Sequence, residues 1–197
     1  AAHQMASNAL PPGERRPGSV GRGTGVKIGI MDQQGALQAS GTTGEVVISG
    51  PNVIQGYESN PEANASSFID GWFRTGDQGV LDEDGVLTLQ GRLKELINRS
   101  GEKISPVEID EVLLQHPAVA EAVAFGVPSA AHGEEPVAAV VLKSEATKRD
   151  LIAYCREKLA AFKVPRTIHI VDTIPRTATG KVQRRIVAEV ITGSPSA

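Results

Sequence analysis

The first half of the chain is dominated by short alternations of apolar and polar residues, the period of half-buried β-strands. We predict strands of this kind at 26–31, 45–48 and 86–89. A short helix or turn is expected over 60–68, and loops are expected at 1–25, which is rich in Gly and Pro, and at 71–77. This part of the sequence is therefore predicted to be rich in β-structure.

The second half has longer apolar periods, which are typical of helices packed on a sheet. Helices are predicted over 106–115, from 147 to about 162 and from about 184 to 191. Strands are predicted at 119–125, 136–142 and 167–171. Together with the β-rich first half, this pattern predicts the α+β fold class, with a small second domain of roughly 100 residues.

The stretch Gly91–Asp110 joins the two halves. It begins with a predicted tight turn at Gly91 and carries many charged side chains. A capping box of Ser105 and Glu108, with Pro106 at the first helical position, then predicts the start of a helix. Such a connector is typical of a hinge between two domains, and equally of an ordinary solvated loop.

Composition and charge exclude several function classes. The 197 residues have a net charge of −3 and only 4% aromatic residues, so neither a basic stripe nor a base-stacking surface for nucleic acid is expected. No apolar run approaches the roughly 20 residues of a membrane span. The single cysteine, Cys155, lies on an apolar helix stripe and is interpreted as a core residue, and a reducing compartment such as the cytoplasm is expected. The four histidines lack metal-ligand spacing, so no metal site is predicted.

Two stretches carry candidate chemistry. In Thr177-Ala-Thr-Gly-Lys181, two hydroxyls and a glycine stand beside a lysine, which suits a phosphate or carboxylate oxygen. The alternative is a glycine-containing turn with a solvated lysine. In Trp72-Phe-Arg-Thr-Gly-Asp77, an aspartate fixed after a glycine can accept two hydrogen bonds from the vicinal hydroxyls of a ribose. The alternative there is a packed aromatic corner with a turn aspartate.

Four motifs occur in an order that resembles the C-terminal part of the adenylate-forming enzymes, which are acyl-CoA synthetases, luciferases and peptide-synthetase adenylation domains. They are Gly44-Glu-Val through Gly56-Tyr57, Trp72 through Asp77, Gly91-Arg-Leu-Lys-Glu95, and Pro175 through Lys181. The resemblance covers essentially the whole chain and points to the acyl-CoA synthetase branch. It implies that 1–91 is the end of a large AMP-binding domain, 92–193 a mobile lid domain and 194–197 a disordered tail.

The resemblance also implies roles for individual residues. Asp77 and Arg92 would hold the ribose of ATP, and Lys94 would be the hinge about which the lid domain swings. Lys181 would touch the reacting carboxylate and phosphate.

The thioester step would use a second set of residues in the lid domain. Ser100 and Gly101 would line the pantetheine channel after the swing. Many relatives carry a lysine where this chain has Asn98, and Lys103 or Arg99 is expected to replace it.

The implied reaction joins a carboxylic acid to CoA in two steps. The acid attacks the α-phosphate of Mg²⁺–ATP to give an acyl-adenylate, and CoA then displaces AMP. The family's ATP loop, rich in Ser, Thr and Gly, and its Thr-Glu pair for AMP and magnesium are missing from the sequence. We therefore expect the chain to begin inside a longer protein, to bear few of the Mg²⁺ ligands, and to be inactive without the N-terminal part of the same enzyme.

The acid is the least determined part of the interpretation. The opening residues Ala1–Asn8 are similar to a segment of oxalate–CoA ligases and peroxisomal-type CoA synthetases, and His3 could pair with the second carboxylate of a small diacid. A loop-capping histidine is the alternative. Other functions left open are a medium- or long-chain acyl-CoA synthetase, an enzyme that loads a carrier protein, and a non-enzymatic lid domain that binds a partner.

Overall fold

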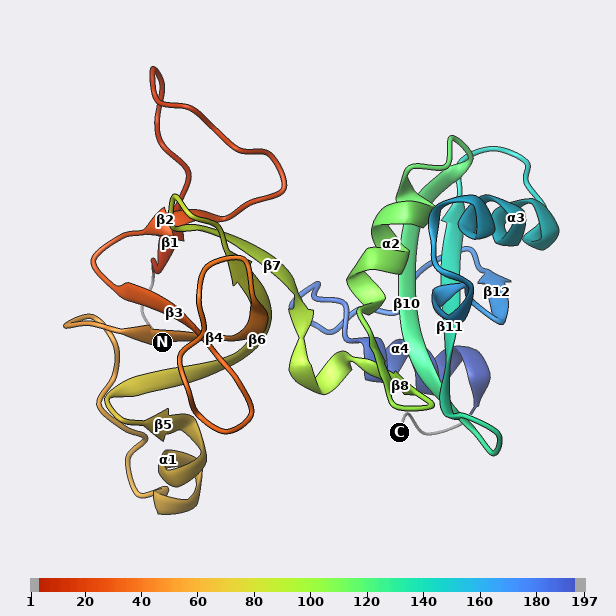
Figure 1. Cartoon of the computed structure of the whole chain (residues 1–197). Helices are drawn as coiled ribbons and strands as arrows, with labels where there is room; N and C mark the ends of the chain where they lie inside the picture. Colours follow the sequence, from red (N-terminus) through yellow and green to blue (C-terminus); the bar gives the residue numbers. More distant parts are fainter. Residues whose placement is uncertain (1–3, 194–197) are drawn as a thin grey trace. The chain divides into compact units, whose positions relative to one another are not determined.

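A computed structural model describes residues 4–193, so the predictions for His3 and for the tail 194–197 lie outside the described residues. The chain divides into two compact units, Ala1–Lys94 and Glu95–Ala197, each built on its own sheet (Figure 1). The predicted α+β class is confirmed. The interpretation of the two units as the end of a large AMP-binding domain and a mobile lid stays a prediction.

The first unit is built on a seven-stranded sheet in the order β1-β2-β7-β6-β4-β3, with β5 paired to β6. Its strands are β1 (Ala6–Ser7), β2 (Gly21–Gly23), β3 (Lys27–Met31), β4 (Thr43–Ser49), β5 (Phe68–Ile69), β6 (Trp72–Leu81) and β7 (Val86–Arg92). One short helix, α1 (Pro61–Ser67), precedes β5 and is capped by the Asn60 side chain. The core of the unit is formed by Ile30, Val46 and Leu87.

One loop prediction in this unit is wrong, and another holds only in part. The stretch 71–77 begins the longest strand of the sheet, β6, because Trp72 and Phe73 pair with β5, and Phe73 also pairs with Ile48 of β4. The stretch 1–25 contains the short strands β1 and β2, which pair with each other, while β2 also pairs with β7. Partners distant in sequence create these strands, so their local turn-like composition is overridden.

The second unit is built on a five-stranded sheet in the order β10-β11-β8-β9, with β12 parallel to β11. Its strands are β8 (Ile97–Arg99), β9 (Glu102–Ile104), β10 (Val119–Ser129), β11 (Gly133–Leu142) and β12 (Thr167–Ile170). Its helices are α2 (Pro106–Leu114), α3 (Lys148–Lys158) and α4 (Arg184–Thr192), with the 3-10 turns η1 (Leu93–Glu95) at the boundary between the units and η2 (Ala161–Lys163) after α3.

Both faces of this second sheet are covered. One cluster joins alternate residues of β10 and β11 to α2, α3 and β12: its members include Ala122, Ala124, Ala138, Val140, Ile109, Leu113, Leu151, Cys155 and Ile168. The intervening residues pack on α4 in a second cluster: Val123, Phe125, Val137, Ala139, Val187 and Ala188. Burial on both faces explains the continuous apolar runs of β10 and β11. The prediction that Cys155 is a core residue is confirmed, and burial raises the pKa of its thiol to about 11.

The connector after Gly91 also differs from the prediction. Gly91 belongs to β7, and the charged stretch beyond η1 folds into the hairpin of β8 and β9. Ile97 and Ile104, at 1% and 0% exposure, anchor this hairpin in the core. Two apolar residues separated by polar ones were too weak a pattern to predict two short strands.

The helix caps are partly as predicted. Thr147 and Asp150 form a reciprocal capping box at the start of α3, which confirms the prediction there. At α2, Ser105 is the N-cap residue and Pro106 is the first helical residue, as predicted. The predicted capping box does not form, because the Glu108 carboxylate accepts two hydrogen bonds from Lys163 Nζ instead.

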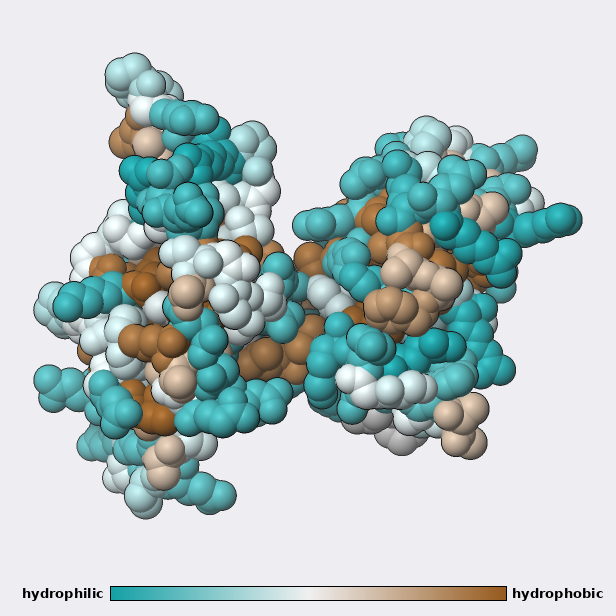
Figure 2. All heavy atoms as spheres, in the orientation of Figure 1, coloured by the Kyte–Doolittle hydropathy of each residue, from teal (hydrophilic) through white to brown (hydrophobic). Residues whose placement is uncertain are grey.

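Hydrophilic side chains cover most of the face of each unit drawn in Figure 2, with hydrophobic residues visible in smaller areas. Between residues 4 and 193, none of the helices has the length and apolar character needed to cross a membrane.

Candidate functional site

Asp77 lies in an irregular stretch of β6. Glu45 of β4 is opposite Gln78, and Val47 is opposite Arg74, so Val46 alone faces the three residues Thr75–Asp77. We call these three residues the Asp77 bulge. A bulge of this kind breaks the ladder and redirects a side chain, which is why bulges are frequent beside functional sites.

Glu45 holds the Asp77 bulge in place from the neighbouring strand. Its Oε1 accepts a hydrogen bond from the Gly76 amide at 3.0 Å, and its Oε2 accepts from Arg74 Nε at 2.7 Å. The Thr75 hydroxyl donates to the Val46 carbonyl at 2.7 Å and accepts from the Asp77 amide at 3.1 Å. Glu45 is only 6% exposed, so this network is a buried frame for Asp77.

Arg92 is brought next to Asp77 by the pairing of β6 with β7, which places the two residues directly opposite each other. Arg92 Nε lies 2.9 Å from Asp77 Oδ1. The Arg92 side chain is 64% exposed and that of Asp77 22% exposed. The two residues predicted to hold a ribose are therefore adjacent, with a carboxylate and a guanidinium at the surface of the unit.

A hollow of about 250 Å³ adjoins Asp77 in the first unit. Its walls are mainly apolar and include Ile28, Val46, Leu87 and Leu89, with Thr75 and Asp77 as polar members. An apolar hollow with a few polar groups is typical of sites that bind small organic molecules.

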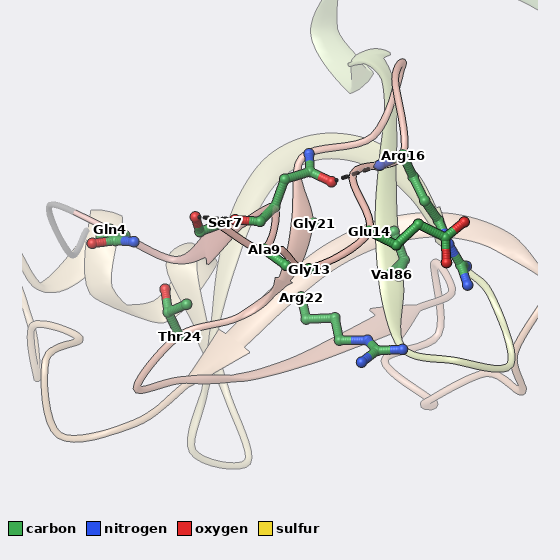
Figure 3. Close-up of a pocket in the computed structure, with 11 residues that line it drawn as sticks. Gln4, Ser7, Ala9, Gly13, Glu14, Arg16, Gly21, Arg22, Thr24 and Val86 are labelled. Atoms are coloured by element: carbon green, nitrogen blue, oxygen red, sulfur yellow. Dashed lines mark hydrogen bonds between the residues drawn. The ribbon is translucent and has the colours of Figure 1, made fainter. Parts of the chain in front are cut away.

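Another hollow, of about 510 Å³, lies among the residues between Gln4 and Thr24 and reaches Val86 (Figure 3). Arg16 lines it, but its guanidinium binds Asp82 and Asp84, and its amide donates to the Asn8 side chain. This hollow is larger than the one beside Asp77, yet none of the described site residues predicted from the sequence lines it.

Lys181 is presented by a turn whose hydrogen bonds are local. The Thr177 amide donates to the Lys181 carbonyl at 2.9 Å, and the Gly180 amide donates to the Thr177 carbonyl at 2.8 Å. The Thr177 hydroxyl also accepts from the Lys181 amide at 3.1 Å. We call Thr177–Lys181 the Lys181 turn. Its backbone is fixed while the Lys181 side chain is exposed, an arrangement suited to an anionic ligand.

Ser100, Gly101 and Lys103 share the β8–β9 hairpin, with Ser100 and Gly101 at its tip in left-handed conformation (φ 52° and 90°). The tip rests on His132, whose carbonyl accepts from the Ser100 amide at 2.8 Å and whose Nδ1 lies 3.0 Å from the Ser100 hydroxyl. Lys103 is exposed and lies opposite Asn98 in the hairpin, so its cation stands beside the position that it was expected to compensate.

The structure thus brings together Asp77 with Arg92 in the first unit, and Ser100 with Gly101 and Lys103 in the second. Lys94 is the last residue of the first unit and lies in η1. The functions predicted for these residues stay predictions.

The sequence interpretation missed two charged residues that support these sites. Glu45 has no predicted role beyond its strand and the Gly44-Glu-Val motif. Its place next to the apolar run Val46–Ile48 is the signal that could have marked it, because a glutamate buried in such a strand needs a charged partner. Arg184, at the start of α4, binds groups from η1, α2 and β10. Nothing in its local sequence indicates these partners.

Known proteins are similar to both units, since curated relatives match almost the whole chain and one family model matches part of the second unit. Residues 108–181 match the family described as the AMP-binding enzyme C-terminal domain. A probable CoA ligase from Humulus lupulus is 57% identical over 96% of this chain and 37% of its own length. An oxalate–CoA ligase from Arabidopsis thaliana is 53% identical over the same shares. The chain therefore spans little more than a third of the length of these curated relatives.

The solved structure of ATP-bound MatB from Rhodopseudomonas palustris has a similar fold. It superposes with a TM-score of 0.89 and 35% sequence identity, over 94% of this chain and 38% of that one. The similarity to adenylate-forming CoA synthetases indicated by the four sequence motifs is confirmed.

Proposed function

Because residues 108–181 belong to the AMP-binding enzyme C-terminal domain family, we propose that this chain supplies the C-terminal part of an ATP-dependent carboxylate–CoA ligase. The complete reaction converts an acid, Mg²⁺–ATP and CoA into an acyl-CoA, AMP and pyrophosphate. The curated relatives extend well beyond the segment matched here, so the activity is proposed for the protein that contains the chain.

In the first step, a carboxylate oxygen of the acid attacks the α-phosphorus of ATP, and the bond from that phosphorus to the bridging oxygen breaks. The products are an acyl-adenylate and pyrophosphate. Asp77 accepts hydrogen bonds from the ribose hydroxyls, with Arg92 beside it, and Lys181 stabilises the charge that moves from the carboxylate to the leaving pyrophosphate. A lysine suits this role because it is a point cation on a long, flexible stem.

In the second step, the CoA thiolate attacks the acyl carbonyl carbon, and the bond from that carbon to the phosphate oxygen breaks. The products are a thioester and AMP. The hairpin tip at Ser100 and Gly101 lines the channel for the pantetheine arm, with Lys103 as a cation nearby. A swing of the second unit about Lys94 exchanges the Lys181 turn for this hairpin between the two steps.

For the acid, we propose oxalate or another small diacid. The 53% identity to an oxalate–CoA ligase supports this choice, and His3 would pair with the second carboxylate. The single cysteine, which is buried, supports a reducing compartment, and we propose the cytoplasm.

The observation that carries the proposal is the Lys181 turn. An exposed lysine follows a glycine and two threonines on a backbone fixed by its own hydrogen bonds. A fixed backbone with an exposed side chain is what charge stabilisation by Lys181 requires, and the variants described in the Discussion separate this role from that of a freely solvated lysine.

The test uses a hybrid ligase, in which this chain replaces the matched 192-residue segment of the A. thaliana oxalate–CoA ligase. We expect release of AMP that requires ATP, oxalate and CoA together. The control is the same ligase with the segment deleted. Both proteins are assayed with a panel of acids from oxalate to long-chain fatty acids. The proposed activity is refuted if the hybrid is no more active than this control with every acid.

Two further outcomes separate the alternatives. Release of AMP that requires a phosphopantetheinylated carrier protein and not CoA would identify a carrier-loading enzyme. For the acid, His3→Ala in the hybrid ligase should reduce the rate with oxalate far more than the rate with a fatty acid. Equal losses with both acids would exclude His3 from diacid recognition.

A further inference from the structure

Arg184 binds three separate segments of the second unit through one guanidinium group. Its Nε donates to Glu95 Oε2 at 3.0 Å, its Nη1 donates to the Ala124 carbonyl at 2.8 Å, and its Nη2 lies 2.7 Å from Asp110 Oδ2. The Arg184 side chain is 16% exposed and that of Asp110 12% exposed. A planar group with diverging donors suits such a junction, which a lysine could satisfy only in part.

Ala124 closes this network into a ring. Its amide donates to Asp110 Oδ1 at 2.5 Å, while its carbonyl accepts from Arg184. Because β10 is an edge strand of the sheet, the outward backbone groups of Ala124 need partners from outside the sheet. Asp110 and Arg184 are these partners, and the ring therefore fixes the guanidinium against the rigid centre of the unit.

The Lys181 turn leads directly into this ring. Arg184 is the first residue of α4, and only Val182 and Gln183 separate it from Lys181. Val182 packs against the core cluster between the sheet and α4, so the short link between the turn and the ring is itself anchored.

A second arginine holds the other end of the Lys181 turn. Arg176 forms an ion pair with Glu121 of β10 at 2.5 Å and donates to the Gly180 carbonyl at 3.3 Å. Arg176 is half exposed, whereas Arg184 is largely buried, so Arg184 provides the firmer attachment. The Lys181 turn is therefore flanked by two arginine contacts, and that of Arg184 is the more buried of the two.

The same ring also holds the chain directly after the proposed hinge. Glu95 follows Lys94 and is the first residue of the second unit. Its carboxylate binds Arg184, so the backbone beyond Lys94 is tied to the body of the unit that carries the Lys181 turn. The second unit is therefore anchored to its own body from its first residue.

From this geometry we propose that Arg184 is a positioning residue for Lys181, which links the end of the hinge to the base of the Lys181 turn so that both move as one rigid body. This inference rests on the proposed function and adds to it a residue that needs no contact with ATP, acid or CoA. Loss of Arg184 would leave the charge of Lys181 intact but its position poorly defined.

The principal test measures the first half-reaction of the hybrid ligase as acid-dependent exchange of pyrophosphate into ATP. Arg184→Met should lower the exchange rate by about 100-fold, the scale of a misplaced catalytic group, with little change in the KM for ATP. The matched control is Arg185→Met, because Arg185 is adjacent, 64% exposed and paired only with Glu189 of its own helix among the residues described from 4 to 193. Arg184→Lys, which keeps the positive charge but places all its donors on one nitrogen, should give an intermediate rate.

A double variant decides whether Arg184 acts through Lys181. In a Lys181→Ala background, Arg184→Met should reduce the remaining exchange by less than about threefold, because a missing side chain cannot be misplaced. If the two losses multiply, Arg184 is a structural residue and the inference is wrong. The folded state of each variant is checked by hydrogen exchange, and if Arg184→Met is unfolded, Arg184→Lys takes its place in this cycle.

The outcomes also separate this inference from the proposed function. If the unchanged hybrid and its Arg185→Met variant both lack acid-dependent exchange, the proposed function fails. If both are active and Arg184→Met is equally active, only the positioning role of Arg184 is overturned.

Discussion

The Asp77 bulge and the Lys181 turn present their key residues in opposite ways. Thr75 and Gly76 are held by groups of β4 that lie about thirty positions earlier in the sequence, since the Gly76 amide binds Glu45 at a separation of 31 residues. The Lys181 turn is closed by bonds between residues no more than four positions apart. The backbone around Asp77 is therefore shaped by a neighbouring strand, whereas the backbone of the Lys181 turn is shaped by hydrogen bonds within the turn itself.

This difference fits the separate tasks that the proposed function gives to Asp77 and Lys181. A carboxylate that must recognise the same ribose in every step benefits from a buried frame. A lysine that follows charge as it moves benefits from an exposed stem on a fixed base. The variants below test this contrast, beginning with the largest expected effect.

Lys181→Ala should slow formation of the acyl-adenylate by about 100- to 1,000-fold, the usual effect of losing one preorganised charge at a reacting centre. Pyrophosphate exchange in the hybrid ligase measures this rate. Lys148→Ala, at an exposed lysine of the same unit, is the control and should leave the rate unchanged. A loss below about tenfold would mean that Lys181 is the freely solvated lysine of the alternative interpretation.

Glu45→Gln should disturb the Asp77 bulge without removing Asp77. The variant leaves Arg74 without its buried anionic partner, and we expect a loss of about 2 kcal/mol in the stability of the first unit and a higher KM for ATP. Fluorescence of Trp72, the single tryptophan, follows the unfolding of this unit in urea. The control is Glu62→Gln, at an exposed glutamate of α1. If both variants have the same stability and the same KM for ATP, Glu45 is not needed to hold Asp77 in place.

Lys94→Pro should slow thioester formation roughly tenfold more than adenylation, because a fixed backbone angle opposes the swing that the second step needs. The two half-reactions are compared in the hybrid ligase, the second with supplied acyl-adenylate. Unchanged thioester formation would place the hinge elsewhere.

The smallest expected effect is a pH dependence in the second unit. Burial raises the pKa of Asp110 from 3.8 to about 6 against the opposing influence of Arg184. The Asp110 carboxyl therefore binds its proton more tightly in the folded chain than in the unfolded chain. The contribution of this proton to the free energy of unfolding is complete below pH 3.8 and is lost as the pH rises through about 6.

Between about pH 5 and about pH 7.5, this carboxyl should account for a fall of roughly 1 kcal/mol in the free energy of unfolding. Urea unfolding of the chain followed by circular dichroism measures the fall, and Asp110→Asn should reduce it by that amount. An equal fall in both proteins would mean that Asp110 titrates normally.

The sequence was most informative where structure is local. The capping box of α3, the apolar stripe with Cys155 and the glycine turn before Lys181 depend on neighbouring residues, and each was predictable. The order of four motifs was also sufficient to indicate the similarity to adenylate-forming CoA synthetases.

Features formed by distant partners could not be predicted. The stretch that begins at Trp72 resembles a loop in composition, yet pairing with β4 and β5 makes it a strand. The β8–β9 hairpin is defined by burial of Ile97 and Ile104, and the ring around Arg184 by three segments that are far apart in the sequence. Such contacts arise only when the fold brings those segments together.

The central claim is that the second unit serves two steps with two different elements, the Lys181 turn and the tip of the β8–β9 hairpin. Its most direct test is a side-by-side measurement of both half-reactions in Lys181→Ala and Gly101→Leu hybrid ligases. A leucine at Gly101 would meet no neighbouring atom within 4 Å of its Cβ, although the φ of 90° strains any residue with a side chain there. Both its bulk and this strain are confined to the hairpin tip, where the pantetheine channel is proposed, and leave the core of the unit unchanged. We predict opposite patterns, with Lys181→Ala impaired in adenylation alone and Gly101→Leu in thioester formation alone. Equal loss of both half-reactions in both variants would contradict the account.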